Sequence, residues 1–511
     1  MTWWNHAAPF FAYLNRSQFL LQQGLPISDL LYYYGDNAPN FVRLKRDDPA
    51  KVLPGYDYDV TDSEVLLSRL SIAGGVLRTP EGITYKALAL PVAGMFPLAE
   101  LLRMEQYVRA GGTLIGVRPL GPQGIVSAAD RQQFQETVAR LWTPCDASER
   151  HRVALGRGQI FCTGKAHDAL LSMGVMPDVE SMEKGENDLD YVHRRDKEND
   201  IYFLRNTSDA PIERRVLFRS TPGQPEFFHA DTGAVDETLL YSPTQDERTV
   251  VPISLGAHES IFVVFRHTPA AAYVTEIERD GASIYAAGTS SGSLPKASIS
   301  RRTDGLHLIT EVPGIYRVKL SDGRIATVST PLESLVQITG PWTLSFPAGW
   351  GAPATTEVRQ LESWNESNDP GVRYFAGTAT YSTVLNLTPG QAAAGMSSDL
   401  NLGEVREVAT VRINGENAGT VWKRPYAVRP GSLLHSGANR IEIEVTNLWP
   451  NRLIGDARDP NGKQYTWTNI RKYTKDSPLL PSGLMGPVKI QPVYDLILKA
   501  GNSAAATNER N

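Results

Sequence analysis

The sequence feature that most constrains the fold is a strict alternation of apolar and polar residues near the C-terminus. In Arg440–Thr446, the apolar residues Ile441, Ile443 and Val445 are separated by charged or hydroxylated residues. Side chains of a β strand point alternately to its two faces, so this pattern predicts a strand with one buried face and one face in solvent. The C-terminal part of the chain should therefore be built from half-buried strands.

Neighbouring segments repeat this pattern. Thr378–Leu387 and Val408–Ile413 are rich in β-branched residues and alternate in the same way. Asn414 and Gly415 tolerate the positive φ angles of a tight hairpin turn, and Ala418–Trp422 follows as the returning strand. Several such strands separated by turn residues predict a sandwich of two sheets.

The N-terminal region, from about Pro26 to Gly174, alternates strand-like and helix-like patterns, which favours a parallel sheet of roughly four strands. One helix should be capped by Thr61 or Asp62, and another begins with Pro97. Strands are expected at 28–34, 85–91, 113–117 and 158–162, and helices at 60–70, 97–108 and 131–141.

Composition restricts the partners. The 511 residues, 41% hydrophobic, suffice for roughly three or four domains of about 100–200 residues. A net charge of −5 gives no basic surface for nucleic acid, and no uninterrupted apolar run of about 18 residues predicts a membrane span. The first eleven residues lack a basic leader, so the chain as written is expected to be cytoplasmic. Cys145 and Cys162 allow at most one disulfide and are expected to be buried free thiols.

Several sequence blocks resemble a known enzyme family. Their order and spacing are similar to the C-terminal part of bacterial α-L-rhamnosidases of glycoside hydrolase family 106, and the later blocks resemble the jelly-roll sugar-binding domain of family 2 glycosidases. The early blocks are Thr2–Trp4, Leu31–Asp36 and Leu53–Asp59, and the later ones are Gly371–Tyr381, Leu402–Arg406, Val411–Gly415, Val421–Tyr426 and Asn447–Asp456.

Together, the patterns and the resemblance predict a multidomain chain of α/β plus all-β class. The α/β part should be a flavodoxin-like or amidotransferase-like parallel sheet, followed by a β-sandwich and a galactose-binding-like jelly roll. The expected divisions are 1–25 as the end of an upstream catalytic-barrel region, 26–175 as the α/β domain, 188–268 as the β-sandwich, 269–336 as a linker and strand-rich bridge, 337–495 as the jelly roll and 496–511 as a disordered tail.

The resemblance implies carbohydrate chemistry. Family 106 enzymes are inverting and use calcium, and their acid and base carboxylates lie in a barrel. The βα pattern here is too short for such a barrel, which takes about 250 residues. The resemblance therefore implies the accessory half of an α-L-rhamnosidase-like enzyme that acts on rhamnose-containing plant or microbial glycans. No cofactor is expected in this chain, and calcium belongs to the full-length enzyme. An upstream catalytic barrel is the expected partner, with a periplasmic or secreted location if the chain is a fragment.

Two other readings stay open. The chain could be a stand-alone carbohydrate-binding protein without catalysis. A separate enzyme that uses the α/β crevice has less support, because the turn after Val117 contains neither Cys nor Ser as a nucleophile.

Asp57 and Asp59 are the candidate catalytic residues. Glycoside hydrolysis needs two carboxyl groups, and the flanking tyrosines of Tyr56–Asp59 could stack on a sugar and raise a carboxyl pKa. The alternative is that these aspartates cap the following helix and accept hydrogen bonds from loop amides.

The candidate carbohydrate-binding residues are Trp422, Trp449, Asn451, Arg452 and Asp456. Indole rings stack on sugar C–H faces, and the stretch from Trp449 to Asp456 is expected to be a loop that leaves the best-patterned strand. By resemblance to family 2 enzymes, its polar residues would reach the substrate. The alternatives are a buried Trp422 and a structural ion pair between Arg452 and Asp456. No metal-ligand pattern is present.

Overall fold

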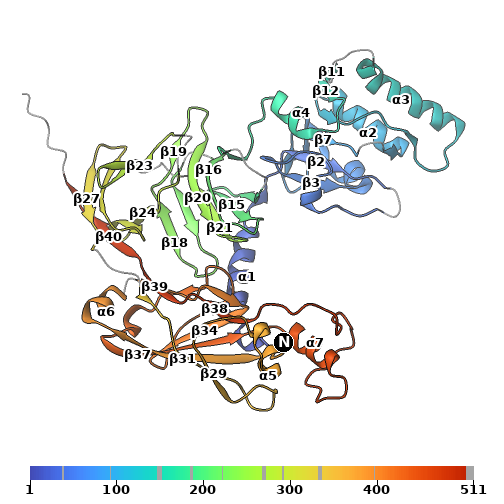
Figure 1. Cartoon of the computed structure of the whole chain (residues 1–511). Helices are drawn as coiled ribbons and strands as arrows, with labels where there is room; N and C mark the ends of the chain where they lie inside the picture. Colours follow the sequence, from blue (N-terminus) through green and yellow to red (C-terminus); the bar gives the residue numbers. More distant parts are fainter. Residues whose placement is uncertain are drawn as a thin grey trace, which may run out of the picture.

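The structure is a computed structural model that describes residues 1–36, 40–91, 94–146, 152–183, 188–220, 223–267, 272–289, 293–331, 336–395 and 398–501. Strands predominate and form several sheets. Figure 1 shows an α/β unit (residues 30–172) at one end, a central β unit (mainly residues 179–329), and a C-terminal β unit (residues 336–492), with helix α1 (Ala8–Leu21) beside the last two.

The α/β unit contains a six-stranded sheet. Its order is β11 (Arg152–Leu155), β12 (Gly158–Phe161), β9 (Thr113–Ile115), β7 (Ala87–Ala89), β2 (Leu30–Tyr33) and β3 (Tyr58–Thr61). All neighbours are parallel except β11 and β12. Helices α2 (Leu98–Arg109) and α3 (Ala128–Asp146) contribute to the hydrophobic core on one face, and α4 (Ala166–Ser172) contributes to the core on the other. The expected parallel sheet with flanking helices is confirmed, with two strands more than expected.

Details of this unit differ from the sequence prediction. The segment expected as a helix over 60–70 begins as the end of β3 and continues as a π-helix at Val65–Arg69, with Asp62 Oδ1 accepting a hydrogen bond from the Val65 amide. Small elements complete the unit: β4 (Ser71–Ala73), β5 (Val76–Arg78), β6 (Thr84–Tyr85), β8 (Met95–Phe96) and β10 (Gly121–Pro122). Cys162 is disulfide-bonded, so the expectation of a free thiol is wrong for this residue. The side chain of Cys145 lies outside the described residues.

A nine-stranded sheet runs through the central β unit. Its order is β1 (Leu25–Pro26), β14 (Leu189–Arg195), β15 (Asn199–Asn206), β21 (Ser260–Arg266), β17 (Pro225–Phe228), β18 (Val235–Thr238), β24 (Ala297–Arg302), β25 (Gly305–Thr310) and β40 (Tyr494–Leu498). One part of the sheet shares a core with a four-stranded sheet, β13 (Val179–Ser181), β16 (Ile212–Phe218), β20 (Thr249–Leu255) and β19 (Ser242–Pro243).

The other part of the nine-stranded sheet shares a second core with a five-stranded sheet. The order of that sheet is β23 (Ala282–Ala286), β22 (Val274–Arg279), β26 (Ile315–Leu320), β27 (Ile325–Ser329) and β41 (Ala500–Gly501). Val274 and Ile277 are fully buried in this core, so the description of 269–336 as partly a linker is wrong for the hairpin of β22 and β23. The loop-like compositions flank a folded hairpin. Residues 268–271 and 290–292 of the expected linker lie outside the described residues.

The chain end also departs from the prediction. β40 pairs with β25 and β41 pairs with β27, so residues 496–501 return to the central β unit instead of beginning a disordered tail. Leu498 is buried in the core there. Residues 502–511 lie outside the described residues.

The C-terminal β unit has two main sheets. The larger has the order β30 (Thr355–Val358), β29 (Trp342–Ser345), β31 (Thr378–Leu387), β37 (Gly437–Thr446), β34 (Val408–Ile413) and β35 (Glu416–Val421). The smaller has the order β28 (Val336–Gln337), β39 (Lys489–Pro492), β32 (Ser398–Asn401) and β36 (Ala427–Val428), and β33 (Glu404–Arg406) pairs with β38 (Gly483–Gly486). Short helices α5 (Pro370–Arg373) and α6 (Pro389–Gly395) accompany them.

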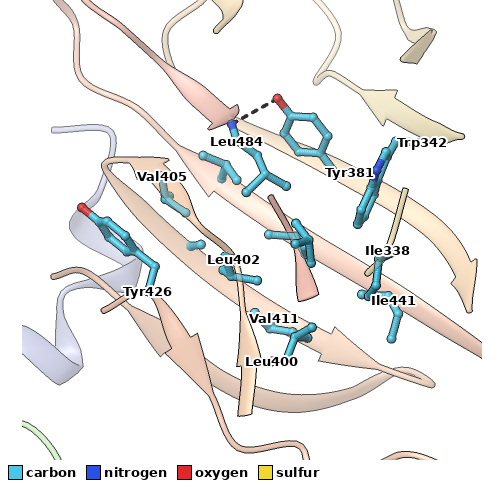
Figure 2. Packing of buried hydrophobic residues seen from close by; sticks show 14 of the residues in the cluster. Ile338, Trp342, Tyr381, Leu400, Leu402, Val405, Val411, Tyr426, Ile441 and Leu484 are labelled. Atoms are coloured by element: carbon cyan, nitrogen blue, oxygen red, sulfur yellow. Dashed lines mark hydrogen bonds between the residues drawn. The ribbon is translucent and has the colours of Figure 1, made fainter. Parts of the chain in front are cut away.

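A single hydrophobic core joins these sheets. Ile441, Ile443 and Val445 are fully buried, as their alternation predicted. Figure 2 shows Leu400 of the smaller sheet in the same cluster as Ile441 of the larger one, and the backbone N–H of Leu484 donating to the Tyr381 hydroxyl at 3.2 Å. The expected pairing of two sheets around a common core is therefore present.

Helix α1 fastens the C-terminal unit to the central one. Its residue Tyr13 packs with the core of the nine-stranded sheet, and Arg16 donates hydrogen bonds to the carbonyls of Ala230 and Asp231 at 3.0 and 2.9 Å. On its other side, Phe10 and Tyr13 meet Trp422 of the C-terminal unit edge-on, with ring centroids 5.1 and 5.4 Å apart. The N-terminal segment thus positions the two β units.

Candidate functional sites

The stretch predicted as a binding loop is a helix. Helix α7 spans Pro450–Arg458, with Trp449 at its N-cap and Pro450 in its first turn. Proline ends the pairing of the preceding strand but is well suited to the first turn of a helix, where its missing N–H has no intrahelical partner. The prediction of a loop is therefore wrong, because Pro450 both ends the strand pairing and begins a helix.

Asn451 anchors a second segment of the chain. Its Nδ2 donates to the Leu480 carbonyl at 2.7 Å, and its Oδ1 accepts from the Leu480 amide at 2.8 Å. The side chain is buried, and both polar groups of its amide are engaged. Asn451 therefore holds the backbone at Leu480 and does not face solvent.

Arg452 and Asp456 form the ion pair that was the structural alternative. Arg452 Nη2 lies 2.9 Å from Asp456 Oδ1, and the two side chains are 8% and 6% exposed. Asp456 Oδ2 also accepts hydrogen bonds from the Tyr465 amide at 3.0 Å, the Thr466 amide at 2.8 Å and the Thr466 hydroxyl at 2.7 Å. The Arg452 guanidinium lies 4.6 Å from the centre of the Tyr465 ring.

Helix α7 therefore turns its polar residues towards the segment that follows it. We call residues 459–482, which run from the end of α7 to β38 without a helix or strand, the α7 loop. Gly455 permits the close packing of α7, since a Cβ there would lie 2.6 Å from the Tyr374 ring. The i, i+4 spacing of Arg452 and Asp456 after Pro450 is the sequence signal that predicts this helix.

The two candidate tryptophans lie in different surroundings. Trp422 is half-buried and packs against Phe10 and Tyr13 of α1. Trp449 is 40% exposed at the start of α7. Trp467, which is not among the candidate residues from the sequence, is 81% exposed in the α7 loop. An aromatic residue in a polar segment without periodicity was the signal available for it.

Asp57 and Asp59 lie in the α/β unit, remote in sequence from α7. Asp57 Oδ2 is 3.0 Å from Lys45 Nζ, and Asp57 Oδ1 accepts a hydrogen bond from the Tyr58 amide. Asp59 accepts a hydrogen bond from the Tyr85 hydroxyl at 2.7 Å. Burial raises the pKa of Asp57 to about 6, although the Lys45 ammonium acts in the opposite direction. The two carboxylates are thus held by separate partners.

Lys45 also connects the α/β unit to the central β unit. Its Nζ lies 3.1 Å from Asp190 and donates to the Tyr191 carbonyl at 2.6 Å. This cluster stands beside a cavity of about 1180 Å³ between the two units, whose lining includes Lys45, Asp190, His167 and Arg205. Several lining charges are paired with each other, as Asp190 is with Arg205 at 3.1 Å. Lys45 was not predicted from the sequence, because its partner Asp190 is distant in sequence.

Comparison with known proteins shows which family the chain is similar to. Residues 1–242 match the glycoside hydrolase family 106 model, described as alpha-L-rhamnosidase. Over these residues, the chain is similar to glycoside hydrolase family 106. The structure is similar to that of a rhamnosidase from Novosphingobium sp. PP1Y, with 30% identity and a TM-score of 0.69. A curated protein of Formosa agariphila, named putative beta-glucuronidase, is 23% identical.

The chain spans about half the length of the relatives that it matches. The matches cover 96% of this chain in each case, but only 41% of the Novosphingobium rhamnosidase and 57% of the Formosa protein. The matches therefore do not show the activity, substrate or partners of the whole relatives for this chain.

Calcium, which the resemblance implies for the full-length enzyme, takes six to eight oxygen ligands. Within the described residues, no group of three or more His, Cys, Asp or Glu side chains is placed to hold a metal ion. The acidic side chains of the described residues therefore form no group of three that could bind calcium. In the same part of the chain, no helix is long and apolar enough to cross a membrane.

Proposed function

We propose that this chain is the accessory part of a family 106 glycoside hydrolase that acts on rhamnose-containing glycans, and that its catalytic carboxylates lie outside these 511 residues. The observation that carries the proposal is the match to the Novosphingobium rhamnosidase. It covers nearly the whole of this chain but less than half of that protein.

The surroundings of the acidic candidates support this proposal. An inverting glycosidase places two carboxyl groups about 6.5–9.5 Å apart across a sugar and a water molecule. Asp57 is held by Lys45, and Asp59 by the Tyr85 hydroxyl. Their carboxylates have partners within the fold, which favours a structural role. The raised pKa of Asp57 is the one property that favours a general acid.

The architecture supports finer assignments. We assign the α/β unit to the flavodoxin-like or amidotransferase-like class, because parallel strands carry helices on both faces. We assign the C-terminal unit to the jelly-roll sugar-binding class, because two antiparallel sheets enclose one core. In this assignment the C-terminal unit contacts the glycan, while the catalytic barrel is supplied by another part of a longer protein.

Activity measurements test the location of the catalytic groups. The purified chain is incubated with an aryl α-L-rhamnoside, with calcium present and after chelation, and the expected result is no turnover. Turnover that is abolished by Asp57→Asn or Asp59→Asn, but retained in the matched control Asp168→Asn, would place the catalytic centre in this chain. Asp168 is an exposed aspartate of α4 and serves as the control for an unrelated carboxylate.

The alternative is a stand-alone carbohydrate-binding protein, which the exposed Trp350, Trp449 and Trp467 of the C-terminal unit favour. An immunoblot of the source cells with an antibody against this chain separates the two. A band much larger than expected for a chain of 511 residues supports the accessory part of a longer enzyme. A band at the size expected for 511 residues supports the stand-alone protein.

We also propose that the protein works outside the reducing cytoplasm, in the periplasm or secreted. The disulfide at Cys162 supports this location, because disulfides persist in oxidising compartments. Thiol labelling of the freshly isolated protein tests it. Modification of Cys162 without prior reduction would contradict the proposal.

A further inference from the structure

The α7 loop exposes large apolar side chains on an otherwise polar segment. Trp467 is 81% exposed and Ile470 is 68% exposed. Figure 1 shows the loop projecting beside α7, at the end of the C-terminal unit that lies away from α6. Two large apolar side chains exposed within four residues offer apolar area that a ligand can bury, so we take this position as a candidate interaction surface.

Contacts with α7 anchor this loop on both sides of its exposed segment. Asp456 fixes the backbone at Tyr465 and Thr466, and Asn451 fixes it at Leu480. Between them, Arg458 donates to the carbonyls of Lys475 and Ser477, at 2.9 and 3.1 Å. A loop that is already ordered loses little conformational entropy when it binds a ligand. The contacts of α7 thus prepare the exposed side chains for binding.

The charge of the segment indicates the kind of ligand. From Arg458 to Leu480 there are five cationic residues and two carboxylates, in a chain whose net charge is −5. Exposed basic residues are common, but Arg471, Lys472 and Lys475 form no ion pair with any carboxylate of the described residues. Elsewhere on this unit, exposed arginines such as Arg424 and Arg429 are paired with Glu404 and Asp399.

We propose that the outer face of the α7 loop binds a carboxylate-bearing saccharide, such as a uronic acid residue of the glycan. The Trp467 ring would stack on the apolar face of a sugar ring, and the Arg471 and Lys472 cations would pair with the carboxylate. This inference rests on the proposed carbohydrate function and adds the charge of the ligand. A neutral sugar would leave Arg471, Lys472 and Lys475 without a carboxylate partner.

Calorimetry of the intact chain with two matched probes tests the proposal. The probes are hexagalacturonate and its full methyl ester, which have the same rings but differ in charge. We expect the ester to bind about 10-fold or more weaker, since an interaction with a charged group contributes about 1.5–3 kcal/mol. Binding of the acid should also weaken as salt is added, because the exposed charges are screened.

Variants locate the binding surface. Trp467→Ala should abolish measurable binding, and Arg471→Gln or Lys472→Gln should weaken it several-fold. The matched controls are Phe19→Ala, which removes an exposed aromatic ring of α1, and Arg359→Gln, which alters an exposed guanidinium of the C-terminal unit. Both should leave binding unchanged. Since the three loop side chains are exposed, the thermal transition of each variant should match that of the wild type.

Three results would overturn the inference: equal affinity for acid and ester, no binding of either probe, or normal binding by Trp467→Ala. The second result would indicate that the loop meets another protein surface instead. None of them bears on whether the native protein is longer than this chain, so failure here is distinguishable from failure of the proposed function.

Discussion

Replacing Arg452 by Met tests whether the ion pair of α7 is structural. The change keeps an unbranched apolar side chain and removes the guanidinium with its charge. It leaves the Asp456 carboxylate, 6% exposed, without its counter-ion at 2.9 Å. Breaking a buried ion pair costs about 3–5 kcal/mol. Because three hydrogen-bond donors of the α7 loop still face Asp456 Oδ2, we expect the lower end, about 3 kcal/mol.

Hydrogen exchange at the loop amides is the appropriate measurement. The chain has several separate cores, so its unfolding is not expected to be a single two-state transition. The amides of Tyr465 and Thr466 donate to Asp456 and therefore report the opening of this contact. A loss of about 3 kcal/mol corresponds to exchange on the order of 100-fold faster at these amides.

A surface ion pair supplies the control. Arg440→Met removes a guanidinium that pairs with Glu442 while 65% exposed, and such pairs contribute little to stability. It should leave exchange at Tyr465 and Thr466 unchanged. If Arg452→Met also leaves their exchange unchanged but weakens glycan binding, the structural reasoning is wrong and Arg452 contacts sugar, as the sequence first suggested.

Two further perturbations test other contacts. His193 is buried between Asp178 and Asp200, 2.9 Å from each. Arg219 and Arg195 lie near the same carboxylates. Burial opposes the charge of the His193 ring, but the two aspartates outweigh it, and the pKa of His193 is raised above 6.5. The stabilisation by the charged His193 ring is present below pH 6.5 and is lost as pH rises through the folded pKa. His193→Gln should therefore lower the midpoint of the thermal transition of the central β unit more at about pH 6 than at about pH 9. Trp422→Ala removes the ring that packs against Phe10 and Tyr13, and should destabilise the packing of α1 by about 2 kcal/mol. Trypsin should then cleave faster at Arg16, while glycan binding stays unchanged. Lost glycan binding with an unaltered α1 would instead support the predicted sugar contact.

The sequence correctly predicted the elements whose conformation depends on adjacent residues. The alternation in Arg440–Thr446 depends only on which face is buried, and β37 follows it. Asn414 and Gly415 adopt φ angles of 53° and 86°, as the predicted hairpin turn requires. Helix α2 begins after Pro97, as its sequence indicated. In each case a few adjacent residues determine the backbone conformation.

Features that depend on distant partners escaped prediction. β40 joins β25 across nearly 190 residues, and no local pattern indicates such a pairing. The hairpin of β22 and β23 was masked by loop-like residues on both sides, although Val274 and Ile277 are fully buried. Lys45 acquires its role only when the fold brings Asp190 to it. Each feature that was not predicted depends on a distant contact partner, whereas the buried face of a single strand could be predicted from its own residues.

The α7 region shows why the sequence pointed to the correct segment but the wrong side chains. A loop of more than twenty residues without regular structure must satisfy its backbone groups and offset its ordering entropy. Asn451 and Asp456 meet part of this need, because they bond loop amides and a loop carbonyl from a buried helix face. From the sequence alone, such a group of polar residues after a strand is easily interpreted as a ligand-binding site. Their effect is to hold the next segment still, so the side chains free to meet a glycan are those that this loop carries outwards, Trp467 first among them.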